Sequence, residues 1–545
     1  MKALMQDWPL LVHTVLDHAE TYHGDVEVVS RTVEGPIHRY TYADMAGRAR
    51  QLADAAQKKL GIKEGDVVGT MAWNGYRHME TWYAVMGIGG VVHTLNPRLF
   101  TEQLTYIINH ADDGWFFLDL TFVPILEAVQ DQLDTVKGFV IMTDRAHMPE
   151  TTLKNVVCYE ELLSEGDAGF VWPKLDETIP CGMCYTSGTT GNPKGVVYSQ
   201  RSNVLHAMAT CAADALGVSS RETIMPVVPM FHANAWSMAF SVPMSGGKLV
   251  LPGAQMDGAS IFELLTEEKV TLTAAVPTIW LMLLQYLEAN PAKKLPDLSR
   301  VVIGGAACPE SMMDAFEQNY DAQVIHAWGM TEMSPLGSLC TRKPGLSDEE
   351  WKVARVKQGR PAYTIEMKIT DDDGNVLAND GKAFGHLMVR GPGVSSAYHK
   401  GEGGNILDDE GFFDTGDVST LDENGYMQIT DRSKDVIKSG GEWISSIDLE
   451  NLAIGHPEVT EAAVIGVAHP KWDERPLLII VAKEGCSPSQ ESILAFMEGK
   501  IAKWWMPEDV AFVEEIPHTA TGKISKLRLR EQFKGYELAS AKAVG

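Results

Sequence analysis

Apolar positions in the N-terminal part of the chain follow two periods in turn. Residues 42–60 and 75–87 carry them at helical spacing. Before and after these stretches lie short runs that are apolar at nearly every position, as is typical of strands buried on both faces. These runs predict strands at residues 67–72, 91–95, 116–120 and 138–142. The alternation of helix and strand predicts an α/β fold in which helices cover layered parallel sheets.

The alternation is clearest between residues 270 and 332. Predicted strands end near residues 276, 303 and 328, and helices fill the intervals between them. In a parallel sheet, ligands lie beyond the carboxyl ends of the strands. Gly305 and the pair Thr331-Glu332 follow two of these ends, so we expect them to line a binding site.

Residues 199–217 also have helical spacing, and Gly217 is suited to end that helix. An amphipathic helix normally turns its apolar face to the core. We expect the buried face to consist of Leu205, Met208, Ala209, Ala212 and Leu216.

The pattern changes after residue 357. Up to about residue 430, short strands alternate with turn sequences such as DDDGN, NDGK and DENG, which predicts a small β-rich subdomain, barrel-like in outline. A charged run at 431–435 follows, and the rest of the chain mixes strands with helix. We therefore expect a large domain of residues 1–433 and a small, mobile α+β domain of residues 434–545.

The composition is that of an ordinary globular protein, with 45% hydrophobic and 22% charged residues in a chain of 545. Its net charge of −27 argues against nucleic acid or an anionic membrane as a partner. No run reaches the ~20 apolar residues of a transmembrane helix, and the N-terminal residues lack the pattern of a signal peptide. Seven scattered cysteines suit a reducing compartment, so we expect a cytoplasmic protein with Cys181 and Cys184 in its core.

The stretch 185–196 reads YTSGTTGNPKGV and combines hydroxyl groups, glycines and one lysine. Glycine lets backbone N–H groups approach a ligand, hydroxyls add donors and Lys194 adds positive charge, which together suit a polyphosphate. The Walker pattern GxxxxGK[ST] does not fit, because Pro193 and Gly195 stand where it needs a glycine and a hydroxyl residue. Apolar runs on both sides predict that two strands hold this loop.

This loop resembles the phosphate loop of the adenylate-forming enzymes, a family of acyl-CoA synthetases, peptide-synthetase adenylation domains and luciferases. Other stretches resemble the family's motifs and follow in its order. They are AWGMTE at 327–332, GFFDTGD at 411–417, DRSKDVIKSGGEWIS at 431–445 and PHTATGKISK at 517–526. The resemblance covers nearly the whole chain, and the GGEWIS form is closest to the fatty acyl-CoA synthetases.

The resemblance implies roles for particular residues. Catalytic roles fall to Lys523, Glu332 and His232. The acyl pocket would be lined by His232, Ala233, Trp236 and Gly305, and CoA would meet Gly440, Gly441 and Glu442. The nucleotide would be held by Thr186, Ser187, Gly188, Thr189, Thr190, Lys194, Gly305, His326, Ala327, Trp328, Thr331, Asp417, Arg432, Lys438 and Trp443. Lys434 would be the hinge, and the magnesium ligands would be Thr186 and Glu332.

At one position the chain departs from the family's pattern. Trp328 replaces the usual tyrosine of the Y-G-x-T-E motif, so we expect it to stack on adenine without a phenolic hydroxyl. Near the C-terminus, Lys526, Arg528 and Arg530 break the acidic trend, and we expect them to help hold anionic CoA.

The resemblance implies an ATP-dependent ligase that needs Mg²⁺. A small carboxylate, of short or medium chain length, would first be joined to AMP and then transferred to CoA while the small domain turns about its hinge. A medium- or long-chain fatty acyl-CoA synthetase is the alternative within this class. A luciferase-like or peptide-synthetase-type adenylating enzyme and a nucleotide-binding protein without turnover also stay open. By analogy with related fatty acyl-CoA synthetases, we expect a homodimer.

Overall fold

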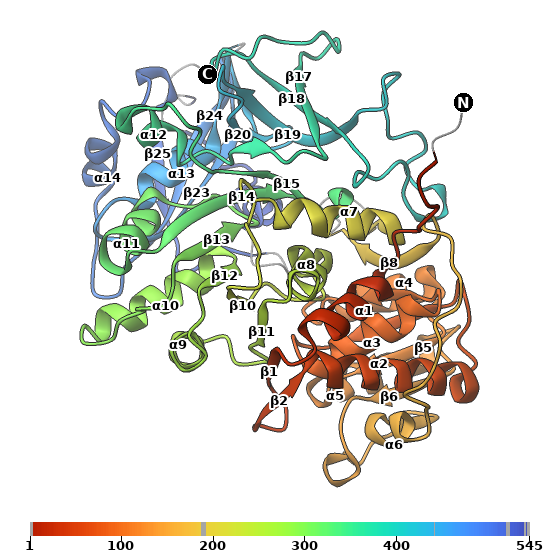
Figure 1. Ribbon diagram of the computed structural model, residues 1–545. Coiled ribbons are helices and arrows are strands. Elements are labelled where there is room, and N and C mark those ends of the chain that lie inside the picture. The colour runs from red at the N-terminus through yellow and green to blue at the C-terminus, as the bar shows by residue number, and fades with distance from the viewer. Residues whose placement is uncertain (1–3, 187–191, 441, 519–523, 539–540, 542–545) are drawn as a thin grey trace.

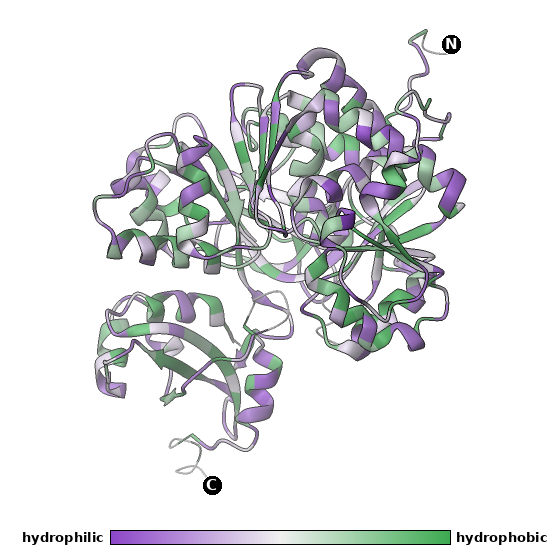
Figure 2. Ribbon diagram, turned by 90° about the horizontal axis from the view of Figure 1, so that it is seen from below, coloured by the Kyte–Doolittle hydropathy of each residue, from purple (hydrophilic) through white to green (hydrophobic). Residues whose placement is uncertain are grey.

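The computed structural model describes residues 4–186, 192–440, 442–518, 524–538 and 541. Several predicted site residues lie outside these ranges: Ser187, Gly188, Thr189, Thr190, Gly441 and Lys523. Figure 1 shows the N-terminal half built from two sheets with helices around them, and Figure 2 shows the C-terminal part as a separate lobe. Within the described ranges, no helix has both the length and the apolarity needed to cross a membrane.

The first sheet runs in the order β7-β6-β5-β3-β4-β8-β9. Neighbouring strands are parallel, except for β8 and β9, which pair antiparallel. Its strands are β3 (Val67–Met71), β4 (Val91–Thr94), β5 (Trp115–Leu118), β6 (Gly138–Ile141), β7 (Val156–Cys158), β8 (Pro180–Tyr185) and β9 (Gly195–Ser199). The fully apolar runs in the sequence thus form the centre of this sheet, and Cys181 and Cys184 are buried in β8.

The second sheet runs in the order β16-β15-β14-β13-β12-β10-β11-β1-β2. Its middle strands are parallel, and β2, β15 and β16 are antiparallel to their neighbours. Its strands are β1 (Glu27–Arg31), β2 (Ile37–Thr41), β10 (Thr223–Pro226), β11 (Lys248–Leu251), β12 (Leu272–Ala275), β13 (Arg300–Gly304), β14 (Gln323–Gly329), β15 (Leu336–Leu339) and β16 (Arg360–Pro361). The strands predicted before Gly305 and Thr331 are β13 and β14, and they are adjacent and parallel.

A layer of helices lies between the two sheets. One apolar cluster contains residues of these helices together with residues of both sheets. These helices are α1 (Val12–His23), α2 (Tyr42–Ala55), α3 (Tyr76–Gly87), α7 (Gln200–Cys211) and α8 (Met238–Ser245). The outer faces are covered by α4 (Thr101–Ala111), α5 (Val123–Val129), α9 (Gly258–Glu267), α10 (Pro277–Ala289) and α11 (Glu310–Tyr320). Helix α2 starts at a capping box of Thr41 and Asp44, and α10 starts at a proline, as their sequences favour.

Helix α7 differs from its prediction in length and in orientation. It ends at Cys211 rather than near Gly217, and Met208 is 54% exposed. The buried face instead carries polar groups. Asn203 donates to Cys181 Sγ (3.2 Å), and His206 Nε2 accepts from the Leu336 backbone N–H (2.9 Å). Specific hydrogen bonds between neighbouring elements therefore outweigh the weak apolar periodicity of this helix.

The β-subdomain sheet runs in the order β17-β18-β19-β20 and is antiparallel. Its strands are β17 (Glu366–Thr370), β18 (Phe384–Arg390), β19 (Phe413–Leu421) and β20 (Met427–Arg432). The C-terminal sheet joins β21 (Ile437–Ser439), β22 (Glu442–Ile444), β23 (Val459–His469), β24 (Asp473–Ala482) and β25 (Asp509–Phe512). With it go α13 (Ser446–Ile454), α14 (Gln490–Met497) and α15 (Lys526–Gln532), which pack on its two faces. The remaining described α-helices are α6 (Tyr159–Ser164) and α12 (Asp348–Ala354).

Candidate active site

The base of the predicted phosphate loop is closed by hydrogen bonds between its two ends. Strands β8 and β9 place Tyr185 opposite Gly195. Beyond them, the Thr186 N–H donates to the Lys194 carbonyl (2.9 Å), and the Lys194 N–H donates to Thr186 Oγ1 (3.2 Å). Both ends of the loop are thus fixed to a rigid sheet, as the flanking apolar runs predict.

Gly195 is required by packing at this base. A Cβ atom there would lie 2.9 Å from His399 Cβ, closer than real Cβ atoms come, and 3.1 Å from Tyr185 Cζ, which is also tight. The Tyr185 hydroxyl is itself held by His110 Nδ1 at 2.7 Å. A Walker-type loop would need a Ser or Thr at this position, and the structure leaves no room for one.

Lys194 and Glu332 come together through a residue that the sequence did not single out. The Lys194 ammonium lies 4.7 Å from the centre of the Tyr398 ring, and the Tyr398 hydroxyl donates to Glu332 Oε1 at 2.8 Å. Burial, and then the Glu332 carboxylate, raise the pKa of Tyr398 well above its ordinary value, so the phenol stays a donor. Tyr398 lies in a turn-rich stretch without a recognisable motif, and only its aromatic character gave a signal.

The carboxylate of Glu332 is suited to an ion that arrives with a nucleotide. Among the residues that the structure describes, no three or more His, Cys, Asp or Glu side chains gather to form a metal site. Mg²⁺ commonly takes one or two protein carboxylates and completes its shell with phosphates and water. Glu332 is only 7% exposed, and Tyr398 contacts both its carboxylate and Lys194, so its setting fits this mode of binding.

The predicted acyl-pocket residues Trp236 and Gly305 are neighbours. A Cβ on Gly304 would lie 3.1 Å from Trp236 Cη2, and one on Gly305 would lie 3.1 Å from Val276 Cγ1. Gly305 also has a φ of +81°, which favours glycine. The end of β13 therefore passes directly under the indole of Trp236, which is 7% exposed.

Trp236 belongs to a backbone turn of unusual hand. Five successive non-glycine residues have φ between +41° and +70°. They are Ala233, Asn234, Ala235, Trp236 and Ser237. A left-handed turn costs roughly 1–2 kcal/mol per L-residue, so buried neighbours must hold it; one of them is Asn203, whose Oδ1 accepts from Asn234 Nδ2 (3.0 Å). His232 precedes the turn with an ordinary φ of −120°. The sequence HANAW contains no glycine, so it gives no indication of a left-handed turn.

Two predicted nucleotide residues, Arg432 and Trp328, contact a third, Asp417. Asp417 and Arg432 face each other across β19 and β20, with Arg432 Nε 2.6 Å from Asp417 Oδ1. The Trp328 indole N–H donates to the other oxygen, Oδ2, at 2.9 Å. Asp417 is 2% exposed, so its charge is compensated inside the protein.

A cleft of about 470 Å³ separates the end of the second sheet from the small domain. Its lining includes Ala307, His326, Gln358, Asp448 and Phe496. His326 is 1% exposed, and burial lowers its pKa to about 4, so its ring is neutral. Two further predicted residues lie in or just beyond β14: Ala327 is a buried strand residue, and the Thr331 carbonyl accepts from the Tyr198 hydroxyl at 2.7 Å.

The predicted CoA contacts lie on the small domain. Gly440 has a φ of +61°, and a Cβ there would lie 3.1 Å from Trp472, whose carbonyl accepts from the Gly440 N–H at 2.8 Å. Glu442 and Trp443 lie in β22, where Trp443 pairs with Lys438 of β21. Lys434 and Lys438 are exposed. Gly440 therefore lies on the surface of the small domain, beside a tryptophan.

Lys526 does not lie where we expected it. Instead of facing solvent as a CoA contact, its ammonium lies 2.9 Å from Glu450 and 3.9 Å from Asp431, and it is 10% exposed. Arg530 pairs with Asp435 at 2.7 Å, and the Arg528 guanidinium lies 5.5 Å from the centre of the Phe100 ring in the large domain. Charge composition alone could not show that buried carboxylates compete for these cations.

Comparison with known proteins gives the class of the chain. The family model of the AMP-binding enzyme matches residues 16–399, and that of the AMP-binding enzyme C-terminal domain matches residues 448–523. The chain belongs to the AMP-binding enzyme family.

Relatives along nearly the full length are CoA ligases. A 3-methylmercaptopropionyl-CoA ligase of Ruegeria lacuscaerulensis is 50% identical over 98% of this chain and 99% of its own length. A medium-chain-fatty-acid–CoA ligase of Ectopseudomonas oleovorans is 47% identical over 98% of each chain. The predicted membership in the adenylate-forming acyl-CoA ligases is thereby confirmed.

Solved structures share the fold. The anthranilate CoA ligase AuaEII, in complex with anthranoyl-AMP, superimposes with a TM-score of 0.86 at 23% identity, over 97% of this chain and 99% of its own. ATP-bound MatB from Rhodopseudomonas palustris gives 0.80 at 22% identity, over 96% and 99%. The predicted α/β fold with a large N-terminal part and a smaller C-terminal one is confirmed.

Proposed function

We propose that the chain joins a short- or medium-chain carboxylic acid to CoA at the expense of ATP, by way of an acyl-AMP intermediate. The observation that carries this proposal is that the predicted residues form two groups. Asp417 contacts both Arg432 and Trp328, which lies near the end of β14. Lys194 and Glu332, which follows β14, both contact Tyr398. The first group suits a ribose, and the second suits a phosphate chain.

In the first step, a carboxylate oxygen attacks the α-phosphorus of ATP, a P–O bond forms and pyrophosphate leaves. Two anions must meet, so positive charge has to be placed where negative charge develops. Lys194 would take the departing pyrophosphate, and Lys523 would bridge the carboxylate and the α-phosphate. Glu332, with Thr186, would hold Mg²⁺, which when bound neutralises the phosphates. Each such pair, at ~4 Å and an effective dielectric of ~20, is worth about 4 kcal/mol before desolvation.

In the second step, the CoA thiol loses its proton and its sulfur attacks the acyl carbon, and AMP leaves. Lys523 has no role here. The small domain would turn about Lys434, withdraw Lys523 and bring Gly440, Gly441 and Glu442 to the pantetheine. Domain closure of this kind often limits turnover.

The division of labour can be tested at Lys523. Lys523→Ala should lower ATP–pyrophosphate exchange by about 10²–10³-fold, the effect of losing one preorganised donor. Thioester formation from acyl-AMP supplied directly should stay within about threefold, since the lysine is absent from that step. Equal loss of both half-reactions would refute the proposal.

For the acid itself, we propose 3-methylmercaptopropionate, the substrate in the name of the 50% identical relative. The buried indole of Trp236 beside Gly305 supports this choice, because a bulky ring in the proposed acyl pocket is compatible with a short substrate. A medium-chain fatty acid is the second candidate, favoured by the 47% identical relative. kcat/KM for C3 to C12 acids and for 3-methylmercaptopropionate would decide between them. Trp236→Ala should shift that profile toward longer acids, and an unchanged profile would remove Trp236 from the pocket.

The homodimer and the cytoplasmic location stay predictions. Light scattering of the purified chain would give the mass of the particle, for comparison with 59.8 kDa for one chain. Fractionation of the cells that make the protein would give its location.

A further inference from the structure

Trp328, which replaces the tyrosine of the family's nucleotide motif, is hydrogen-bonded to Asp417, the residue proposed to hold the ribose. Trp328 lies at the end of β14, and Asp417 lies in β19 of the β-subdomain sheet. The indole N–H of Trp328 donates to Asp417 Oδ2 at 2.9 Å, across the junction between the two sheets. The sequence change and the contact therefore concern the same ring.

The indole itself is held firmly. It is 7% exposed and belongs to an apolar cluster with Met333, Ile365 and Leu387. A Cβ on Gly337 would lie 2.5 Å from Trp328 Cζ3, so that glycine lets the ring pack flat on β15. Because most of the ring faces the core, the edge that carries the N–H has a fixed direction.

Arg432 and Trp328, which both contact the Asp417 carboxylate, differ in rigidity. Arg432 reaches Oδ1 at 2.6 Å, but its side chain is 47% exposed and therefore has many alternative partners in water. Trp328 is buried and has one donor and one direction. An ionised carboxylate can accept about four hydrogen bonds, so a donor on each oxygen can fix its plane while it still accepts from a ligand.

We propose that Trp328 is a positioning residue, whose indole N–H sets the carboxylate of Asp417 to accept the two hydroxyl groups of a ribose. This inference rests on the proposed function, because it needs a nucleotide at Asp417. It assigns the tryptophan a task that differs from stacking on the base. Without the N–H, the Asp417 carboxylate rotates and no longer accepts from the ribose hydroxyls. An aromatic ring at position 328 can still contact the purine.

The test uses two nucleotides and the variant Trp328→Phe. Phenylalanine keeps an aromatic face but has no donor. We expect the Kd of ATP, measured by calorimetry, to rise about tenfold, because a hydrogen bond to a charged group is lost. The Kd of 2′,3′-dideoxy-ATP should change less than about twofold, because that ligand has no hydroxyls for Asp417 to accept.

A matched control is Trp280→Phe. Trp280 is fully buried, and its Nε1 has no hydrogen-bond partner among the described residues, so this variant removes a buried indole without a hydrogen bond. It should leave the ratio of the two Kd values at the wild-type figure. If Trp328→Phe does not fold, replacement of Trp328 by the isosteric benzothienylalanine removes only the N–H.

A second measurement uses Asp417→Asn. In that background Trp328→Phe should raise the Kd of ATP by less than about twofold, because the two residues act through one contact. The inference is overturned if Trp328→Phe weakens ATP and dideoxy-ATP equally, which is the result for stacking, or if neither Kd changes. If the unmodified protein binds neither nucleotide, the proposed function itself fails, and this outcome is distinct from the others.

Discussion

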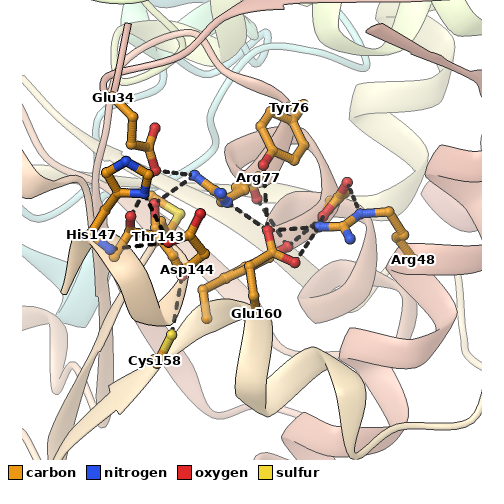
Figure 3. Close-up of polar contacts among 12 residues, drawn as sticks. Glu34, Arg48, Tyr76, Arg77, Thr143, Asp144, His147, Cys158 and Glu160 are labelled. Atoms are coloured by element: carbon orange, nitrogen blue, oxygen red, sulfur yellow. Dashed lines mark hydrogen bonds and ion pairs between the residues drawn. The ribbon is translucent and has the colours of Figure 1, made fainter. Parts of the chain in front are cut away.

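Two buried clusters of charge in this protein have similar chemistry and join different elements. The core cluster consists of Arg48, Glu80, Glu160, Arg77 and Glu34. Figure 3 shows the contacts among Arg48, Glu160, Arg77 and Glu34. It ties α2, α3 and α6 to each other and to the loop after β1, all inside the large N-terminal part. Every member of it has partners within 3.1 Å, and none is a predicted site residue.

The hinge cluster consists of Asp431, Ser446, Glu450 and Lys526. Asp431 is the next-to-last residue of β20, three positions before Lys434, and accepts from the N–H (2.8 Å) and the hydroxyl (2.5 Å) of Ser446 in α13. Lys526 in α15 lies between Asp431 and Glu450. This cluster therefore joins the two sides of the proposed hinge. A cluster of buried charge therefore does not indicate a functional site by itself. The effect of breaking such a cluster depends on which elements the cluster connects.

The largest effect that we expect is on stability, at Glu80 of the core cluster. Glu80 is fully buried and accepts from Arg48 Nε (2.8 Å) and from the Tyr159 hydroxyl (2.7 Å). Glu80→Gln leaves Arg48 short of a buried partner and should lower the free energy of unfolding by about 3 kcal/mol. Denaturant titration measures this loss.

The control for Glu80 is Glu161→Gln, which breaks the exposed pair with Arg145 and should leave the free energy of unfolding nearly unchanged, because water screens this pair. For both variants, the ratio of pyrophosphate exchange to thioester formation should equal that of the unmodified protein. A changed ratio in Glu80→Gln would mean that the core cluster also acts on the proposed reaction.

At the hinge cluster we expect the next largest effect, and it concerns the balance of the two half-reactions. Lys526→Met leaves two buried carboxylates without their cation and frees α15, which directly follows the segment that holds Lys523. Pyrophosphate exchange should fall about tenfold, and thioester formation from supplied acyl-AMP should change little. Lys526→Arg, which keeps the charge, should restore much of the exchange. An equal fall in both half-reactions would make the cluster a purely structural one.

A smaller, pH-dependent effect is expected at Asp448, which lies in α13 beside the hinge cluster. Burial, and then the charge of Asp431, raise its pKa to about 6. Between the pKa of the unfolded chain and this value the folded state binds more protons, so stability falls as pH rises through this window. Asp448→Asn should remove about 1 kcal/mol of that loss between pH 5 and pH 7.5. The measurement is the difference in melting temperature between variant and unmodified protein at both pH values, and a difference that does not grow with pH would contradict it.

The smallest effect is expected at Arg530, which is one-third exposed and pairs with Asp435. Its guanidinium also donates to the Lys434 carbonyl at 3.2 Å. Arg530→Gln should change either half-reaction by less than about twofold, because a solvated ion pair contributes little. A tenfold change would place Arg530 in the hinge cluster rather than at its edge.

Sequence periodicity and motifs predicted a large part of this molecule. The apolar runs of β3 to β6 and the alternation of strand and helix around Gly305 depend only on residues that are close in sequence. Such patterns can therefore be read without knowing the tertiary contacts. The motif residues Trp328, Asp417 and Arg432, which are far apart in sequence, come together as their motifs imply.

What the sequence did not reveal depends on partners that only the fold supplies. Tyr398 gains its position from Glu332 and Lys194, and no pattern near residue 398 indicates them. Helix α7 turns its polar side inward because its side chains form hydrogen bonds there with Cys181 and with the Leu336 N–H. Lys526 is drawn inward by carboxylates from two other segments. In each case a contact between distant segments outweighed the local preference.

The left-handed turn at 233–237 has a consequence for redesign. A segment wound against the natural hand of the chain keeps its shape only while its surroundings clamp it, and Asn203 of α7 is one such clamp. Substitutions at Asn203 should therefore change the backbone of residues 233–237, and with it the position of Trp236, without altering any side chain of that turn. Laboratory evolution toward new acids could begin with that helix rather than with the residues that touch the acid.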